Sequence, residues 1–254
     1  MVHDADGLSE ERMAAFARWT NLSETTFLLA PTVPEADYRL RIFTPGGELP
    51  FAGHPTLGSA HAWLEAGGVP HGERIMQECG VGLVELRRDE AGLAFAGPPL
   101  RRSGPVGDEL RDRIAAVLRV PAGDVVDAAW CDNGPGWIGV RVGSAEQVLA
   151  LEPDFVAMAE LKLGVVGPYG EGSDPAVEVR AFASKLGIRE DPVTGSLNAA
   201  LGQWLAGTVL PSSYTASQGT VLQRRGRVRV EREGDTVWVG GRTRTTISGT
   251  VDLG

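Results

Sequence analysis

The spacing of hydrophobic residues predicts a chain in which a few helices alternate with many short strands. Apolar residues recur at helical spacing over Leu8–Thr20, where Ser9 can cap the helix and Glu10 and Glu11 occupy its first turn. Runs typical of strands follow at Thr25–Leu29, Tyr38–Phe43, Arg74–Phe95, Ala128–Val142 and Val177–Ala183. A second helix is predicted over Glu109–Leu118. The pattern indicates the α+β class.

Two further helices are predicted to be apolar almost all the way round. One begins at Gly53-His54-Pro55 and ends at Gly67-Gly68, and the other begins at Asp191-Pro192 and ends at Gly207. Helices of this kind are usually buried on all sides, here wrapped by sheet. Each carries a Trp-Leu pair near its end. We therefore expect a weak internal duplication with halves at 1–102 and 103–254 and a cleft between them, the basic and Gly/Pro-containing stretch at 101–108 marking the boundary.

Composition and charge exclude several classes of protein. The chain has 254 residues, of which 43% are hydrophobic and 22% charged, as in ordinary globular proteins. Lys and Arg number 24 against 33 Asp and Glu, so the formal net charge is −9, which disfavours nucleic acid and anionic membranes as partners. No export signal or membrane-spanning stretch is visible. The two cysteines, Cys79 and Cys131, lack C-x-x-C spacing, so we expect a reducing cytoplasm.

The starts of the two apolar helices are candidate anion sites, because a helix N-terminus presents unpaired N–H groups and partial positive charge. Asp191 can be a plain N-cap before a proline, and His54 a plain helix-entry residue, but capping and catalysis are not exclusive. Glu24 is predicted to lie where a turn enters a strand, either as a surface glutamate or as a general base.

Other sequence motifs match a known binding site in spacing but lack the surrounding residues or structure that the site requires. Gly134–Gly139 has dinucleotide-site glycine spacing but continues as a strand, and Gly53–Ser59 has P-loop spacing without the lysine. The four histidines show no H-x-x-x-H, so no catalytic metal is expected. The arginines of 224–229 are interpreted as the solvated face of a strand.

Four segments carry a more specific signal. They are Asn21–Phe27, Arg41–Pro45 together with Glu48–Thr56, Glu190–Ser196, and Gln218-Gly219. In this order they resemble the PhzF (phenazine biosynthesis) family of isomerases over most of the chain. The resemblance implies the diaminopimelate-epimerase fold, with two pseudo-symmetric halves, each a central helix wrapped by a mixed or antiparallel β half-barrel. It also implies an active site between the halves, no cofactor, and a homodimer.

The resemblance also implies roles for individual residues. Glu24 matches the single general acid/base, His54 a residue that binds substrate and assists proton transfer, and Asp191 the aspartate that heads the second central helix. Groups that donate hydrogen bonds to a substrate carboxylate are implied at Gly53, Gly195 and Ser196. In the related cysteine-dependent racemases two thiols sit at the helix starts, where this sequence has Ala52 and Thr194. Two-thiol racemisation is therefore disfavoured.

The sequence departs from the family in two places. A strand and a Gly-Asn-Pro turn ordinarily precede the segment with which this chain starts, and Gln223–Gly226 stands where Gly-Arg-Pro is usual. We expect a cofactor-independent isomerase that acts on a small anionic metabolite of unknown identity. A carboxylate-binding protein without catalysis, and a racemase with Glu24 and Asp191 as opposed bases, remain alternatives.

Overall fold

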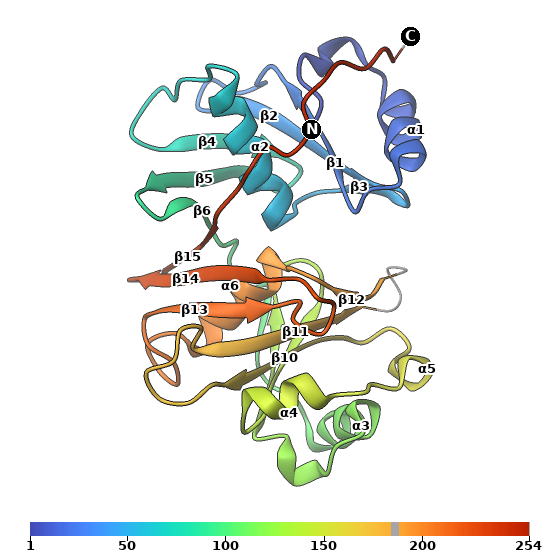
Figure 1. Cartoon of the computed structure of the whole chain (residues 1–254), viewed down its shortest axis with the longest axis vertical. Helices are drawn as coiled ribbons and strands as arrows, with labels where there is room; N and C mark the ends of the chain where they lie inside the picture. Colours follow the sequence, from blue (N-terminus) through green and yellow to red (C-terminus); the bar gives the residue numbers. More distant parts are fainter. Residues whose placement is uncertain (184–187, 254) are drawn as a thin grey trace. The chain divides into compact units, whose positions relative to one another are not determined.

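The computed structural model of the chain describes residues 1–183 and 188–253 (Figure 1). The contacts between residues divide the chain into two compact units. The first unit contains residues 1–96 together with the C-terminal segment from 240, and the second contains residues 97–239. The division into folding domains at 102/103 stays a prediction.

The first unit combines helices with a mixed sheet. Its helices are the 3-10 helix η1 (Ala5–Gly7), α1 (Glu10–Thr20) and α2 (Gly53–Glu65). Its strands are β1 (Thr25–Leu29), β2 (Tyr38–Thr44), β3 (Gly47–Leu49), β4 (Ile75–Cys79), β5 (Gly82–Asp89) and β6 (Gly92–Ala96). The strand order is β1-β2-β4-β5-β6, with β3 paired to β2. The β2–β4 pair is parallel, and α2 makes the crossover that a parallel connection requires.

The second unit is a larger mixed sheet with short helices beside it. Its helices are α3 (Asp108–Leu118), η2 (Ala122–Asp124), α4 (Ala145–Ala150), α5 (Phe155–Met158) and α6 (Gly195–Leu205). Its strands are β7 (Arg102–Pro105), β8 (Asp127–Asp132), β9 (Trp137–Arg141), β10 (Lys162–Pro168), β11 (Val177–Ala183), β12 (Ile188–Asp191), β13 (Ser213–Gln218), β14 (Gly226–Glu233) and β15 (Thr236–Gly241). The order is β15-β14-β13-β11-β10-β9-β8-β7, with β12 paired to β11. The last residues of β15, from 240 on, belong to the first unit.

One connectivity occurs in both units. The path β1-β2-β3-α2-β4-β5-β6 of the first unit recurs as β10-β11-β12-α6-β13-β14-β15. In each case two antiparallel strands and a returning hairpin strand lead into the central helix, which delivers the next strand parallel to the second. The predicted α+β class and the internal duplication, with a central helix in each half, are confirmed.

The central helix α6 packs on a face of its sheet that is lined with glycine. A Cβ atom added at Gly139 of β9 would lie 2.8 Å from the Trp204 ring, and one at Gly164 of β10 would lie 2.1 Å from Leu197 Cδ1. Trp204 and Leu197 both belong to α6. Because these glycines lack a side chain, the helix backbone approaches the strands more closely than larger residues would allow.

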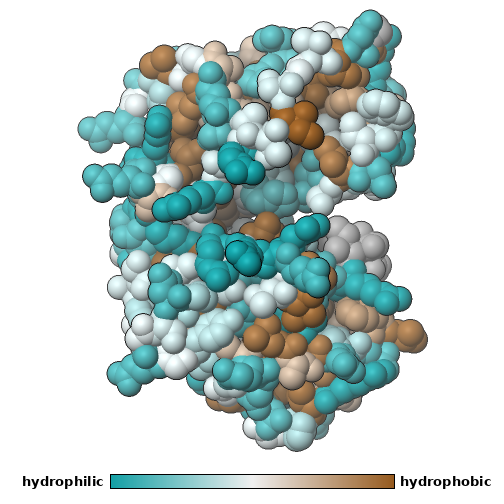
Figure 2. Space-filling model, viewed as in Figure 1, coloured by the Kyte–Doolittle hydropathy of each residue, from teal (hydrophilic) through white to brown (hydrophobic). Residues whose placement is uncertain are grey.

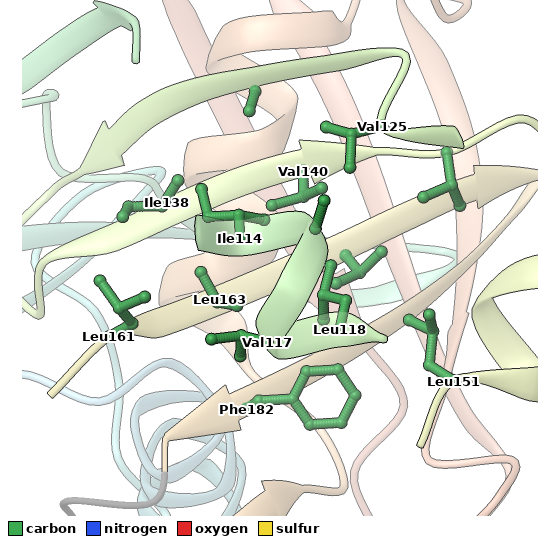
Figure 3. Packing of buried hydrophobic residues seen from close by; sticks show 14 of the residues in the cluster. Ile114, Val117, Leu118, Val125, Ile138, Val140, Leu151, Leu161, Leu163 and Phe182 are labelled. Carbon is green, nitrogen blue, oxygen red and sulfur yellow. The ribbon is translucent and has the colours of Figure 1, made fainter. Parts of the chain in front are cut away.

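The opposite face of the same strands carries branched aliphatic residues. Ile138 and Val140 of β9, and Leu163 and Val165 of β10, alternate with the glycines and join a buried cluster with α3, which Figure 3 shows together with Phe182 of β11. The sheet of the second unit therefore has two buried faces, one against α6 and one against α3 and α4.

Gly164→Ala is expected to lower the free energy of unfolding by about 1–3 kcal/mol, because overpacking forces a fully buried Leu197 out of place. Thermal or denaturant unfolding checks this. The matched control is Gly123→Ala, since a Cβ atom at Gly123 meets nothing within 4 Å. Equal stabilities of the two variants would contradict the close packing of α6.

The expectation that both apolar helices are buried on all sides is confirmed for most of α6 and is wrong for the C-terminal half of α2. His61 and Glu65 form a pair at i and i+4, with His61 Nε2 3.3 Å from Glu65 Oε1, and Glu65 is exposed. Trp63 is partly exposed as well and packs on Tyr38 with ring centroids 5.1 Å apart. The polar pair gives this half of the helix a solvated side.

The surface of each unit is mixed in character. Figure 2 shows hydrophilic residues over much of the visible face, with hydrophobic ones scattered between them. Among the described residues, none of the helices has the length and apolar character that crossing a membrane would require.

Candidate active site

Glu24 lies between the end of α1 and the start of β1. Asn21 ends α1 in the left-handed conformation, with φ 51°, and Thr25 begins β1. The prediction that Glu24 lies where a turn enters a strand is confirmed. The asparagine thus ends the preceding helix rather than capping a new one.

Hydroxyl contacts fix the strand that follows Glu24. Thr25 Oγ1 lies 3.2 Å from Thr20 Oγ1 at the end of α1, and Thr26 Oγ1 lies 2.9 Å from Ser59 Oγ in α2. The second contact is buried. These bonds join β1 to both helices, so the residue before the strand is held in a defined place relative to the start of α2.

Glu24 and His54 form a close pair in the first unit. His54 Nε2 lies 3.0 Å from Glu24 Oε2, with the glutamate side chain 15% exposed and the histidine side chain 42% exposed. Glu24 Oε2 is shielded from solvent, and the approach is at ion-pair distance but outside hydrogen-bond geometry. A partly shielded carboxylate held beside an imidazole can take up a proton and pass it on.

The start of α2 offers a backbone hydrogen-bond donor at the residue that precedes His54. Ala52 is the N-cap and has no side-chain acceptor, and the first backbone bond of the helix runs from Thr56 N to Ala52 O at 3.1 Å. Pro55 has no N–H, and among the described residues no acceptor lies at hydrogen-bond distance from Gly53 N. The Gly53 N–H is therefore available to an anion, where the helix dipole also favours negative charge.

The second central helix begins later than the sequence predicted. Asp191 is the last residue of β12, and α6 starts at Gly195 with Thr194 as its N-cap. The prediction that Asp191-Pro192 starts the helix is wrong because Asp191 pairs with Ala181 of β11, and this strand pairing outweighs the preference of proline for the first helical turn. The Asp191 carboxylate instead accepts a hydrogen bond from Thr194 Oγ1 at 2.7 Å.

Gln218, at the end of β13, holds the start of α6 in place. Its side chain is fully buried. Oε1 accepts hydrogen bonds from Thr194 N at 3.1 Å and Asn198 Nδ2 at 2.8 Å, and Nε2 donates to Asp191 O at 3.0 Å and Thr194 Oγ1 at 2.9 Å. Both donors and both acceptor positions of the carboxamide are thus used. The motif Gln218-Gly219 was visible in the sequence, but no local pattern predicted this role for Gln218.

A second buried glutamine has the equivalent place in the first unit. Gln77, on the strand that follows α2, is fully buried. Its Nε2 donates to Thr56 Oγ1 at 3.1 Å, and its Oε1 accepts from Tyr38 OH at 3.2 Å. Thr56 is the fourth residue of α2, as Asn198 is the fourth residue of α6. Each central helix is therefore bonded near its start to a glutamine on the next strand.

The start of α6 also presents free donors. Gly195 is buried and Ser196 partly exposed, and no acceptor among the described residues lies at hydrogen-bond distance from either backbone N–H. Such a helix start can hold a carboxylate without any positively charged side chain.

Each unit brings its own predicted site residues together. Those of the first unit are Glu24, Gly53 and His54, and those of the second are Asp191, Gly195 and Ser196. The roles assigned to them stay predictions.

The cysteines lie away from the helix starts, as predicted. Cys79 ends β4 and Cys131 lies in β8. Burial raises the pKa of the Cys79 thiol above its usual range and that of Cys131 to about 12. Neither is a thiolate near neutral pH, so neither is suited to remove a proton. Within the described ranges, His, Cys, Asp and Glu side chains form no group of three or more that could hold a metal ion.

The fold and these helix starts define a recognisable class of protein. A crystal structure of a phenazine biosynthesis protein of the PhzF family from Enterococcus faecalis superposes with a TM-score of 0.76 at 26% identity. The match covers 94% of this chain and 86% of that one. The chain therefore has the fold of PhzF proteins, a mixed sheet around central helices.

The sequence comparison makes the assignment specific. The PhzC-PhzF model of phenazine biosynthesis-like proteins matches residues 1–251, and the chain belongs to this family. A Schizosaccharomyces pombe protein named antisense-enhancing sequence 1 is 38% identical, over 97% of this chain and 90% of its own length. The trans-2,3-dihydro-3-hydroxyanthranilate isomerase of Pseudomonas aeruginosa is 34% identical over 80% of this chain and 72% of its own length. The predicted resemblance to the PhzF family of isomerases is confirmed.

Proposed function

We propose that the chain is a cofactor-independent isomerase that transfers a proton next to a carboxylate on a small anionic metabolite. The observation that supports this most directly is the Glu24–His54 pair, with 3.0 Å between Oε2 and Nε2, at the start of α2. A partly shielded carboxylate beside an imidazole is the arrangement that general acid/base catalysis needs.

Glu24 acts first as base and then as acid in this proposal. Its carboxylate takes a proton from a C–H bond of the substrate, and the electron pair of that bond moves into the conjugated acid. Glu24 then returns the proton to a different carbon, so a double bond shifts and no electrons are gained or lost. Because one carboxylate works on one face of the substrate, it moves a double bond more readily than it inverts a stereocentre.

The backbone donors stabilise the charge that develops. The Gly53 N–H lies at the start of the helix that also carries His54, and a donor of this kind contributes about 3 kcal/mol in a site closed to water. In the second unit we assign carboxylate binding to Gly195 and Ser196, and a supporting acid/base role to Asp191. The N–H groups of Gly195 and Ser196, which meet no acceptor among the described residues, support the binding role.

The substrate class follows from this chemistry and from one relative. The Pseudomonas aeruginosa protein is named an isomerase of trans-2,3-dihydro-3-hydroxyanthranilate, a cyclic unsaturated carboxylate. We propose that this chain also takes a small unsaturated or cyclic carboxylate. We further propose a cytoplasmic location, in keeping with two free cysteines, and a homodimer, as the resemblance to the family implies. Light scattering on the purified chain tests the dimer.

Solvent exchange tests the function on many candidate substrates at once. The protein is incubated in D2O with a library of small carboxylates, and proton NMR shows which of them incorporates deuterium at carbon. We expect catalysed exchange, accompanied by a moved double bond, in one chemical class of the library.

Two other results would replace the proposal. Binding shifts without exchange in any compound would identify a carboxylate-binding protein. Deuterium at a carbon that remains a stereocentre but has the opposite configuration would identify a racemase, in which Asp191 would serve as the second base.

A further inference from the structure

The hydroxyl group of Ser196 is held from one side by an indole. Trp137 Nε1 lies 3.1 Å from Ser196 Oγ, and Trp137 is 3% exposed. An indole N–H can only donate a hydrogen bond, so Ser196 Oγ is the acceptor in this contact. The serine hydrogen therefore points elsewhere, and no acceptor among the described residues takes it.

The backbone of the same residue is also held. Asn133 Nδ2 donates to Ser196 O at 2.8 Å, and Asn133 is 5% exposed. Asn133 lies in the connection between β8 and β9, and Trp137 is the first residue of β9. Asp132 Oδ1 stiffens that connection by accepting hydrogen bonds from Gly134 N and Gly136 N, each at 2.7 Å.

The result is a cluster of hydrogen-bond donors at the start of α6. The N–H groups of Gly195 and Ser196 start α6 without an acceptor among the described residues, and the Ser196 hydroxyl adds a third donor because Trp137 occupies its acceptor side. A carboxylate accepts hydrogen bonds at both oxygens, and bonds to a charged acceptor are the stronger kind. A carboxamide presents an NH2 group that such a cluster cannot receive.

We propose that Trp137 is a positioning residue that fixes the Ser196 hydroxyl as a donor and so makes the start of α6 selective for a deprotonated carboxylate. The proposal rests on the proposed function only in taking this helix start as a substrate-binding element. Trp137 lies outside the four segments that resemble the family, and its indole N–H is the group that sets the selectivity.

NMR titration of the full ¹⁵N-labelled chain tests the proposal, with sodium benzoate as probe and benzamide as its neutral counterpart. We expect the backbone signals of Gly195 and Ser196 and the indole signal of Trp137 to shift together, with one Kd for benzoate and no saturable response to benzamide. Because the indole signal is measured in the wild-type chain, the proposal can be tested even where a variant fails to fold. An indole signal that stays still while the two amides shift would overturn the proposal, as would equal responses to both probes.

Variants measure the size of the effect. Trp137→Phe keeps an aromatic ring and removes the donor, and we expect benzoate to bind about 10-fold more weakly. Ser196→Ala should weaken benzoate binding by a similar factor. The double variant should bind benzoate only slightly more weakly than either single variant, since both substitutions remove the same interaction. Trp204→Phe, at the other end of α6, is the matched control. A Trp137→Phe chain that binds benzoate as well as the Trp204→Phe chain does would refute the assignment.

The same titration in a Glu24→Gln chain separates this proposal from the proposed function. Benzoate binding at Gly195 and Ser196 is expected to persist there, because Glu24 supplies none of the hydrogen-bond donors at this helix start. Loss of catalysis and loss of carboxylate selectivity are therefore independent results.

Discussion

Glu24→Gln should reduce deuterium exchange into the substrate by a factor of about 100 to 10,000, the range that a positioned general base contributes. The amide has the size of the carboxylate but cannot accept a proton at neutral pH, so binding of the substrate should change little. The measurement is the initial rate of exchange by NMR, with the Kd of the same compound determined alongside.

The environment of Glu24 differs from that of other glutamates, so we expect the loss of exchange for Glu24 and not for an ordinary surface glutamate. Its Oε2 atom is shielded from solvent with His54 Nε2 3.0 Å away, whereas Glu85 on β5 is a half-exposed glutamate whose carboxylate lies 3.3 Å from Arg74 Nε. Glu85→Gln is the matched control and should exchange deuterium at the wild-type rate. A Glu24→Gln chain that keeps more than about a tenth of the wild-type rate would remove Glu24 from the mechanism.

Arg180→Met should lower the free energy of unfolding by about 3–5 kcal/mol, the cost of leaving one member of a buried ion pair without its partner. Arg180 binds Glu190 through two contacts, Nε to Oε1 at 3.0 Å and Nη2 to Oε2 at 2.7 Å, and the two side chains are only 5% and 7% exposed. Arg180 Nη1 also donates to Val148 O and Leu151 O at the end of α4. Denaturant unfolding gives the difference.

Two further variants show where the cost arises. Arg119→Met breaks an exposed pair with Asp154, whose side chains are 59% and 34% exposed, and should cost no more than about 1 kcal/mol. The double variant Arg180→Met/Glu190→Met removes both charges and should recover part of the stability, because no buried carboxylate is then left unpaired. An Arg180→Met chain as stable as the Arg119→Met chain would contradict this account.

The long and strongly patterned elements could be predicted from the sequence. Ser9 caps α1 as expected, since Arg12 N bonds to its hydroxyl at 3.4 Å, and the strand over Val177–Ala183 has the predicted bounds. The short helices α4 and α5 and the strand β10 were not predicted. The two helices span few residues, and their stability depends on packing rather than on a local repeat. The strand β10 contains Gly164 and Gly167, a residue type that is depleted in strands.

The start of the second central helix shows how tertiary structure overrides a local signal. Asp191-Pro192 has the sequence of a helix start, but the pairing of β12 with β11 keeps Asp191 in the strand. Glu24 and His54 could be named from motifs, yet their proximity depends on the contact between Thr26 and Ser59, which are 33 residues apart. No local pattern carries that information.

The positioning residues were the least predictable part of the site. Gln218 acts through four hydrogen bonds to three residues far from it in the chain, and Trp137 acts through a single bond to Ser196. Glutamine and tryptophan occur in strands for many reasons, so their role becomes visible only when their partners are known.

The paired glutamines have a consequence for how each central helix is oriented. A helix that packs mainly through apolar residues could turn about its axis or slide by one residue with little loss of hydrophobic contact. Gln77 and Gln218 remove that freedom, because their buried amides find partners in Thr56 and Asn198 in only one rotational setting. Each glutamine thus fixes the rotation of its helix about the helix axis and its position along that axis. In this way it also fixes the direction in which the N–H groups at the helix start point.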